Sequence, residues 1–255
     1  MIIWLASYPN SGNDFLRSLL SSYIFSKDGS YNEDVIQNID EFPNNSLFKK
    51  LGVDTNNLDE MNKNYINSQK ILNKKDSIMF LKTYSCFVHT DNFKFTDRHN
   101  TLGVIYVVRD PRQVVFPFSQ SFQLSEEQSL KNLLSKTYLG KDSQSHCTTY
   151  LSSWKDHYNS WKVFTRFNKY LLVKYEDLIK DTEKTFLNIL KFIAHLGRVK
   201  FTLDDIKFKN TLKTTELNKT NESIKLDHVD VKTIDNLEKE LVNEMRELNY
   251  LENKL

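Results

Sequence analysis

The amino-acid sequence predicts one α/β domain, spanning residues 1–255, in which helices cover both faces of a central parallel sheet. Three observations lead to this fold class. Four short apolar runs, rich in β-branched residues, have the length and composition of buried strands. Each run ends in a polar turn, and three of the four turns lead into a segment whose apolar residues have helical spacing.

The four predicted strands cover residues 2–7, 78–82, 104–108 and 170–174. After the first, third and fourth of them, apolar residues recur at spacings of three, four and seven, which predicts amphipathic helices. Their apolar faces comprise Phe15, Leu16, Leu19, Leu20, Tyr23 and Ile24, then Val114, Val115, Phe118 and Phe122, then Phe186, Ile189, Leu190 and Ile193. Sheets of this kind bind ligands beyond the carboxyl ends of their strands, so the polar turns are the candidate site.

Three longer stretches are less regular. Residues 27–76 are rich in Asn, Lys and Asp, and we expect helices and loops over one edge of the sheet. The polar composition of residues 123–150 indicates a lid-like segment, and we expect a surface loop at residues 209–229. A closing helix follows, because one apolar stripe joins Val231, Ile234, Leu237, Leu241, Met245 and Leu248.

The composition narrows the classes of partner and compartment. The net charge is +2 with both signs mixed along the chain, so nucleic acid or an anionic membrane is not required as a partner. The two cysteines, Cys86 and Cys147, have no metal-ligand spacing, which predicts reduced thiols and no metal site. We find no signal peptide and no membrane-length apolar run, and therefore expect a soluble, cytoplasmic protein.

The first turn, "PNSGN" at residues 9–13, connects a predicted strand to a predicted helix. In such a turn the backbone N–H groups point at one spot and the helix dipole adds partial positive charge, which suits an anion. The glycine-rich P-loop pattern with its lysine is absent, and Asp14 follows the turn. Taken alone, an ordinary helix-capping turn explains these residues equally well.

Three further turns carry candidate site residues, each with a simpler alternative. Lys82 ends the second strand, so its ammonium projects at the ligand edge, unless its stem merely covers apolar surface. Arg109 ends the third strand and offers planar donors suited to phosphate, although an ion pair with Asp110 also fits. Tyr175 follows the fourth strand, where its phenol suits either the edge of a nucleobase or the cap of the core.

In this order, the turns resemble those of the sulfotransferase family that uses 3′-phosphoadenosine 5′-phosphosulfate (PAPS). "YPNSGNDF" at residues 8–15 is similar to the family pattern Tyr-Pro-Lys-Ser-Gly-Thr/Asn-Thr-Trp, and "KTY" at 82–84 to Lys-Thr-His. "RDP" at 109–111 and "YEDL" at 175–178 match the family's later patterns, and "WKDHYNSW" at 154–161 resembles its Trp-x-x-His-x-x-Ser-Trp helix. The resemblance extends from Trp4 to about Tyr250 and implies the P-loop-like sulfotransferase fold.

The resemblance also implies how the donor is bound. Backbone N–H groups of Ser11, Gly12 and Asn13 would surround the 5′-phosphosulfate. Lys82 would neutralise charge on the bridging oxygen as the S–O bond breaks, and Arg109 would bind the 3′-phosphate.

The adenine contacts and a second contact to the 3′-phosphate are implied in the same way. Phe15 would stack on the adenine and Tyr175 would hydrogen-bond to it. Pro117 stands where the family often has a serine that binds the 3′-phosphate, and we expect Ser119, or else Ser121, to take its place.

Three positions depart from the family pattern. Asn10 replaces a lysine and Asp14 replaces a neutral hydroxyl, which makes the site more negative by about two charges. We therefore expect the Asp14 carboxylate to turn outward and cap the helix. Tyr84 replaces the catalytic histidine, and a phenol with a reference pKa of about 10 is a poor base at neutral pH unless Lys82 lowers that pKa.

Two alternatives to Tyr84 remain, namely an acceptor that ionises unaided or a base elsewhere, of which His89 and His157 are nearest in the sequence. The glycine-rich basic loop of the family is absent from residues 209–229, the segment on the 3′-phosphate side.

The resemblance predicts an enzyme that moves a sulfuryl group from PAPS to a hydroxyl or amine of a small-molecule or glycan acceptor. The alternative is a catalytically impaired relative that binds an adenine nucleotide or an acceptor without efficient turnover. Acceptor contacts are expected from residues 27–76 and 123–150, whose composition does not identify the acceptor, and the oligomeric state is left open.

Overall fold

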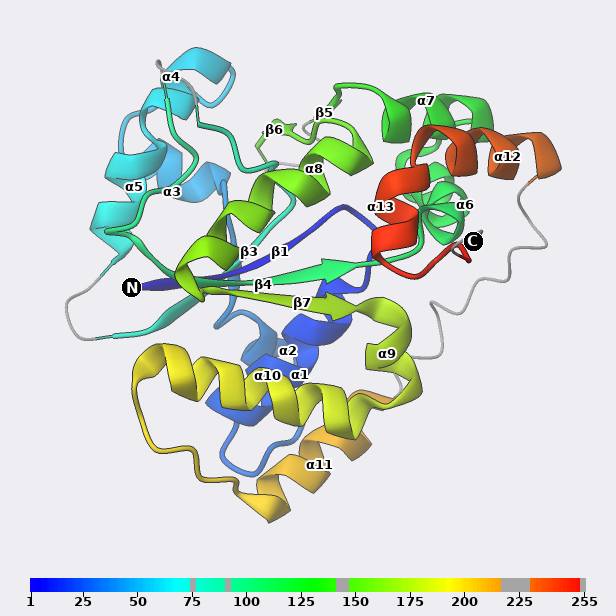
Figure 1. The fold of residues 1–255 in the computed structure, drawn as a ribbon. Helices are drawn as coiled ribbons and strands as arrows, with labels where there is room; N and C mark the ends of the chain where they lie inside the picture. Colours follow the sequence, from blue (N-terminus) through cyan, green and yellow to red (C-terminus); the bar gives the residue numbers. More distant parts are fainter. Residues whose placement is uncertain (74–76, 90–92, 141–146, 217–229, 253–255) are drawn as a thin grey trace.

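A computed structural model describes residues 1–73, 77–89, 93–140, 147–216 and 230–252 (Figure 1). These residues form a five-stranded sheet in the order β2-β3-β1-β4-β7, in which all neighbours are parallel. The strands are β1 (Ile2–Ser7), β2 (Asp40–Glu41), β3 (Met79–Thr83), β4 (Thr101–Val108) and β7 (Tyr170–Lys174). All four predicted strands are confirmed, and the two-residue strand β2 was not predicted from the sequence.

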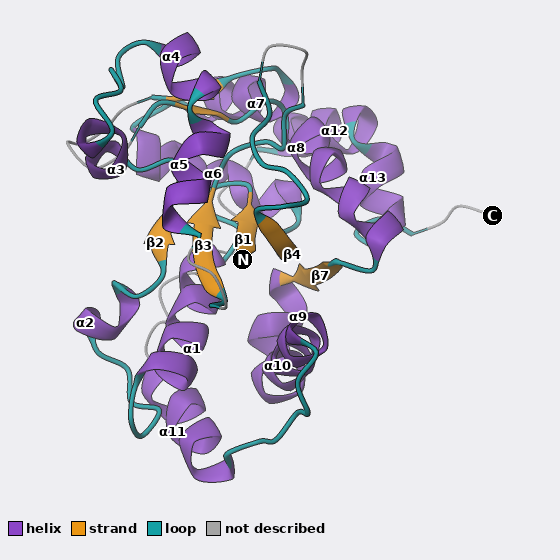
Figure 2. Ribbon diagram, turned by 90° about the vertical axis from the view of Figure 1, so that its left-hand side faces the viewer, coloured by secondary structure: helices purple, strands orange, loops and turns teal. Residues whose placement is uncertain are grey.

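Helices cover both faces of the sheet (Figures 1 and 2). On one face lie α1 (Asn13–Phe25), α9 (Tyr175–Lys180), α10 (Thr182–Gly197) and α11 (Asp205–Thr215). On the other face lie α3 (Asn45–Lys50), α4 (Leu58–Lys63), α5 (Tyr65–Leu72), α6 (Pro111–Phe122), α7 (Glu126–Leu134), α8 (Trp154–Trp161), α12 (Val231–Glu240) and α13 (Val242–Glu247). The short helix α2 (Glu33–Ile36) packs beside α1.

Strand β1 is buried on both faces and contributes to two apolar clusters. Trp4 and Ala6 face the helices around α6 and α8, whereas Ile3 and Leu5 face α1 and α10. This alternation follows from the two-residue period of a strand. Because every strand of this sheet is parallel, all five end at one edge, and the turns after β1, β3, β4 and β7 meet there.

Residues 27–76 and 123–150 form more regular structure than loops alone. The first stretch contains α2 to α5 and the edge strand β2. In the described part of the second, α7 is followed by β5 (Tyr138–Leu139), which pairs in antiparallel fashion with β6 (Thr149–Tyr150). Among the described residues, no helix combines the length and the apolar character needed to cross a membrane.

The predicted surface loop at 209–229 is wrong for residues 209–215, which belong to helix α11. The hydroxyl of Thr211 donates to the carbonyl of Gly29 at 3.1 Å, and Phe208 stacks on Phe186 with ring centroids 5.6 Å apart. These tertiary contacts stabilise a threonine-rich segment of modest helix propensity. Residues 217–229 of that prediction lie outside the described part of the chain.

The predicted closing helix is divided into α12 and α13 at Leu241. Leu237, Leu241, Met245 and Leu248 are buried as expected, but Val231 is exposed at the start of α12.

Candidate active site

The turn after β1 has the geometry of an anion site, and we call residues 10–13 the phosphate cradle. Asn10 and Gly12 adopt positive φ angles of 59° and 93°, which bend the chain sharply before α1 begins. The Asn13 amide donates to the carbonyl of Leu5 at 2.9 Å and to the hydroxyl of Ser7 at 3.0 Å, which anchors the cradle to β1.

Several groups of the cradle are available to a ligand. No side chain caps the first turn of α1, so its leading N–H groups keep their hydrogen-bonding capacity and the positive end of the helix dipole. The buried hydroxyl of Ser11 has no hydrogen-bond partner among the described residues. A phosphate or sulfate group would satisfy both, so the cradle fits an anion.

Tyr175 lies directly against the cradle. A Cβ atom added to Gly12 would be 2.2 Å from Cδ2 of Tyr175, and Gly12 also has a left-handed backbone, so only glycine fits here. The Arg109 guanidinium stacks on the same tyrosine ring, with Cζ 4.4 Å from the ring centroid. Arg109 is buried and donates from Nη1 to the carbonyl of Asn10 at 3.0 Å. The structure thus brings Arg109, Tyr175 and the cradle together.

Lys82 lies between two carboxylates at the same edge. Its Nζ is 2.7 Å from Oδ1 of Asp14 and 3.5 Å from Oε2 of Glu41, and only 6% of its side chain is exposed. The second oxygen of Asp14 accepts a hydrogen bond from the phenol of Tyr84 at 3.2 Å. The expectation that Asp14 turns away to cap α1 is therefore wrong, because an ammonium and a phenol attract it across the site.

The charges of this cluster shift the pKa values of its members. Burial raises the pKa of the Tyr84 phenol, and the nearby Lys82 opposes this shift without reversing it. Partial burial disfavours the charged form of Asp14, but Lys82 outweighs it and lowers the pKa of that carboxyl. Burial also disfavours the charged form of Lys82, yet its anionic neighbours raise the pKa of the ammonium. At neutral pH the cluster therefore holds a charged lysine, a charged aspartate and a neutral phenol.

Comparison with known proteins identifies the family. The sequence matches the profile of the sulfotransferase domain over residues 2–253. The chain belongs to the sulfotransferase domain family. No match was found among curated proteins.

Two of the solved structures that match this chain illustrate the shared sulfotransferase fold. Mouse sulfotransferase SULT7A1 complexed with PAP is 14% identical, with a TM-score of 0.56 over 96% of this chain and 84% of that one. Retinol dehydratase in complex with androsterone and inactive cofactor PAP is 13% identical, with a TM-score of 0.59 over 96% of this chain and 80% of that one. Identities this low show a common fold, which confirms the predicted fold class.

In this sulfotransferase-family protein, His157 is buried and hydrogen-bonded within the core. The ring is fully buried, Nε2 lies 3.0 Å from the Tyr84 carbonyl, and Nδ1 lies 2.8 Å from the Tyr106 hydroxyl. Because a carbonyl can only accept, Nε2 carries the proton and Nδ1 accepts from the phenol. Burial lowers the pKa of His157 to about 4. His89 is exposed and lines a hollow with Lys169, at the edge where the strands begin.

The other predicted donor contacts are Phe15, Ser119 and Ser121, of which the first two are buried. Phe15 is buried in the apolar cluster under α1, so its ring face is covered by core residues. Ser119 is also buried and donates to the carbonyl of Phe116 within its own helix at 2.7 Å. Ser121, two residues further along α6, accepts a hydrogen bond from the Asn10 amide at 2.8 Å and so contacts the cradle.

Glu41 is the site residue that sequence reasoning missed. It lies on β2, whose two residues carry too little periodicity to predict a strand. Pairing of β2 with β3 sets Glu41 opposite Lys82 in the register of the sheet. Among the described residues, no cluster of three or more His, Cys, Asp or Glu side chains has a geometry that could hold a metal ion.

Proposed function

We propose that this protein transfers a sulfuryl group from PAPS to a hydroxyl or amine of a small-molecule or glycan acceptor. The observation that carries the proposal is the meeting of three anion-binding features at one edge of the sheet. These are the uncapped start of α1 with the buried Ser11 hydroxyl, the Lys82 ammonium and the buried Arg109 guanidinium. The donor, when bound, supplies the activated sulfuryl group.

The chain would contribute charge and orientation to such a transfer. The Lys82 ammonium would offset negative charge developing on the departing phosphate oxygen, and buried surroundings strengthen that effect. Arg109 and the cradle would bind the phosphates of the donor, while Tyr175 would contact its base. Positioning and charge neutralisation account for most of the catalysis expected in group transfers of this kind.

The acceptor proton needs a base, and we propose Asp14 acting through Tyr84. Tyr84 alone cannot take up the acceptor proton, because its raised pKa keeps the phenol protonated at neutral pH, but the phenol donates its own proton to Oδ2 of Asp14. As the acceptor oxygen forms its bond to sulfur, its proton would pass to the Tyr84 oxygen, and the Tyr84 proton would pass to Asp14. The phenol is neutral before and after this step, and the carboxylate gains the proton.

The alternative is a relative that binds nucleotide with little turnover. The ion pair at 2.7 Å between Lys82 and Asp14 favours this alternative. The carboxylate already neutralises the ammonium that sulfuryl transfer from the donor would require. Measurements of binding and of turnover separate the two functions.

Calorimetric titration with 3′-phosphoadenosine 5′-phosphate (PAP), the desulfated donor, tests the site. We expect saturable binding that Arg109→Ala weakens by about ten- to a hundredfold, since a hydrogen bond to a charged group is worth about 1.5–3 kcal/mol. Arg166→Ala, which removes an exposed arginine from the other edge of the sheet, is the matched control. No heat at millimolar PAP would overturn the assignment.

Transfer of radiolabelled sulfate from PAPS to a panel of phenols, amines and glycans then tests turnover. Binding of PAP without transfer to any acceptor would favour the impaired relative.

A further inference from the structure

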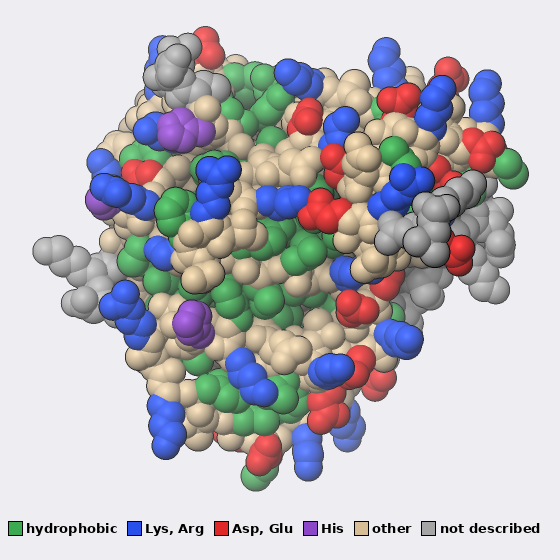
Figure 3. All heavy atoms as spheres, viewed as in Figure 1, with side chains coloured by type: hydrophobic (Ala, Val, Ile, Leu, Met, Phe, Trp, Pro, Cys, Tyr) green, Lys and Arg blue, Asp and Glu red, His purple; other side chains and the backbone are tan. Residues whose placement is uncertain are grey.

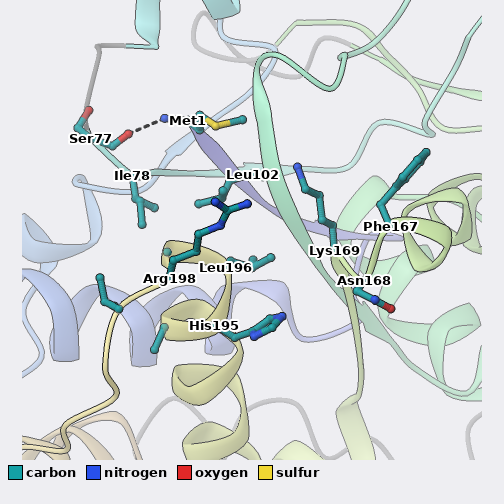
Figure 4. A pocket seen from close by; sticks show the side chains of 13 residues that line it. Met1, Ser77, Ile78, Leu102, Phe167, Asn168, Lys169, His195, Leu196 and Arg198 are labelled. Carbon is teal, nitrogen blue, oxygen red and sulfur yellow. Dashed lines mark hydrogen bonds between the residues drawn. The ribbon is translucent and has the colours of Figure 1, made fainter.

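A cavity lies at the opposite edge of the sheet, where the strands begin (Figure 4). Its volume is about 900 Å³, within the range of small-molecule sites. Residues just before β3 and β7, the second residue of β4 and the end of α10 line it. None of the residues that we assign to sulfuryl transfer contributes to this cavity.

Exposed apolar side chains gather around the cavity. Ile78, Phe167 and Val199 are 42%, 64% and 62% exposed, respectively. They are three of the eight large hydrophobic side chains that are clearly exposed in the described part of the chain. Single exposed apolar residues are common, but a group of them around one hollow marks a binding surface.

The same cavity is lined by cations. Lys169 and Arg198 are these cations, the imidazole of His195 lies beside them, and none of the described lining residues is Asp or Glu. Figure 4 shows Arg198 extending from the end of α10 toward Leu102, and Lys169 extending beside it from the start of β7. Neither of these two side chains forms an ion pair with a described carboxylate.

A neighbouring hollow extends this positive surface. It shares Phe167 and Lys169 with the cavity and adds Lys94 and Arg98, with Asp97 as its one acidic lining residue among those described. In Figure 3 the blue and purple side chains of Lys, Arg and His surround green apolar surface on this side of the molecule.

Arg198 stands at a backbone position that glycine would suit better. Arg198 is the residue after α10 and has a φ of 53°, a left-handed conformation in which glycine is preferred. A side chain in this conformation costs about 1 kcal/mol relative to glycine. The preceding residue, Gly197, is the last residue of α10. The left-handed position, which glycine would suit best, is therefore taken by Arg198 and not by the adjacent glycine.

We propose that this cavity binds an anionic amphiphile, a molecule with a carboxylate, sulfate or phosphate head on an apolar body. The head would contact Lys169 and Arg198, and the apolar body would cover the exposed faces of Ile78, Phe167 and Val199. The concave shape favours a single molecule over a bilayer surface, because a flat bilayer would reach only the rim. The proposal is independent of sulfuryl transfer, since the two sites lie at opposite edges of the sheet.

Calorimetry with sodium dodecanoate below its micelle concentration tests the proposal on the full chain. We expect saturable binding with one site, which Arg198→Gly and Lys169→Ala each weaken by about tenfold. Phe167→Ala should weaken it as well, through loss of apolar contact. Dodecyltrimethylammonium, which has the same chain and the opposite charge, should not compete.

Arg198→Gly separates a binding role from a structural one. Glycine suits the left-handed backbone, so the Tm should stay the same or rise while dodecanoate affinity falls. Lys209→Ala on α11 removes an exposed cation outside the cavity and should leave that affinity unchanged. PAP binding should be unchanged in Arg198→Gly.

Two results would overturn the proposal. One is dodecanoate binding that is equal in the wild type and in Arg198→Gly. The other is co-sedimentation with phosphatidylglycerol vesicles in the absence of any binding of monomeric dodecanoate, which would assign this face to a membrane surface.

Discussion

Asp14 controls the electrostatics of the proposed donor site. Its carboxylate is 60% exposed and lies 2.7 Å from the Lys82 ammonium, so part of its charge faces the space in front of the phosphate cradle. A donor with several negative charges would meet both this carboxylate and a lysine already paired with it. Donor binding must therefore separate Asp14 from Lys82 or tolerate the carboxylate nearby.

Asp14→Asn should change binding and turnover in opposite directions. Loss of the negative charge frees Lys82 for the donor, so we expect PAP to bind about tenfold more tightly. The amide cannot accept the Tyr84 proton, so the rate constant for sulfuryl transfer should fall. Calorimetry and steady-state kinetics measure the two effects, with Asp59→Asn on α4 as the exposed control. An unchanged PAP affinity would show that Asp14 does not oppose the donor.

For individual residues, the sequence predicted which side chains meet at the candidate site, but it did not predict the orientation of Asp14. Lys82, Arg109 and Tyr175 lie at or just after the carboxyl ends of strands in a parallel sheet, so topology brings them to the edge that carries the cradle. The orientation of Asp14 depends on Lys82 and Tyr84, which lie 68 and 70 residues further along the chain. Local helix-capping preference favoured the opposite orientation, and the tertiary ion pair outweighs it.

Among the elements, α8 connects the site to the core through His157. The ring joins α8 to the end of β3 through the Tyr84 carbonyl and to β4 through the Tyr106 hydroxyl. It thereby positions the backbone of the residue that we propose to receive the acceptor proton. Since both ring nitrogens are engaged and the ring is buried, His157 supports Tyr84 as a positioning residue.

Burial of neutral His157 predicts acid sensitivity. The folded protein holds the pKa of His157 at about 4, below the usual value near 6.5, so the unfolded chain binds a proton more readily between these pH values. The contribution to stability is complete above about pH 6.5 and is lost as the pH falls toward 4, by up to about 3 kcal/mol. Urea unfolding at pH 7 and pH 4 measures the change in the free energy of unfolding.

His157→Gln should lose less stability between the two pH values than the wild type, although it is less stable at pH 7. His99→Gln, at an exposed position, should behave like the wild type. Equal pH dependence in the wild type and His157→Gln would contradict the assignment.

Elements with strong periodicity were predictable, and elements stabilised by distant contacts were not. The strands β1 and β7 have the predicted bounds, because continuous apolar runs between polar turns define them. Strand β2 is too short to show a period, and its pairing with β3 determines it. Helix α11 forms at the start of the predicted surface loop, since its threonine hydroxyls find partners on the α1–α2 connection.

On the scale of the whole molecule, the two edges of the sheet carry different surfaces. The strands point toward one edge (Figure 1), which carries the cradle, Lys82 and Arg109, and the proposed amphiphile cavity lies at the other edge, where the strands begin. The C-terminal helices α12 and α13 return to the first of these edges. Arg112 joins them to it through Glu238 on α12 at 2.6 Å and through the Tyr250 carbonyl at 3.0 Å.

Arg112→Ala should loosen this C-terminal segment without unfolding the domain. Arg112 also pairs with Asp110, the residue after Arg109, at 2.6 Å, so its loss leaves a buried carboxylate without its ion-pair partner. We expect a loss of about 2–3 kcal/mol in the free energy of unfolding. Amide hydrogen exchange should accelerate in α12 and α13, while α10 exchanges as in the wild type. Arg246→Ala, on the exposed face of α13, is the control, and equal exchange in the two variants would show that packing of Leu237, Leu241 and Met245 alone holds the segment in place.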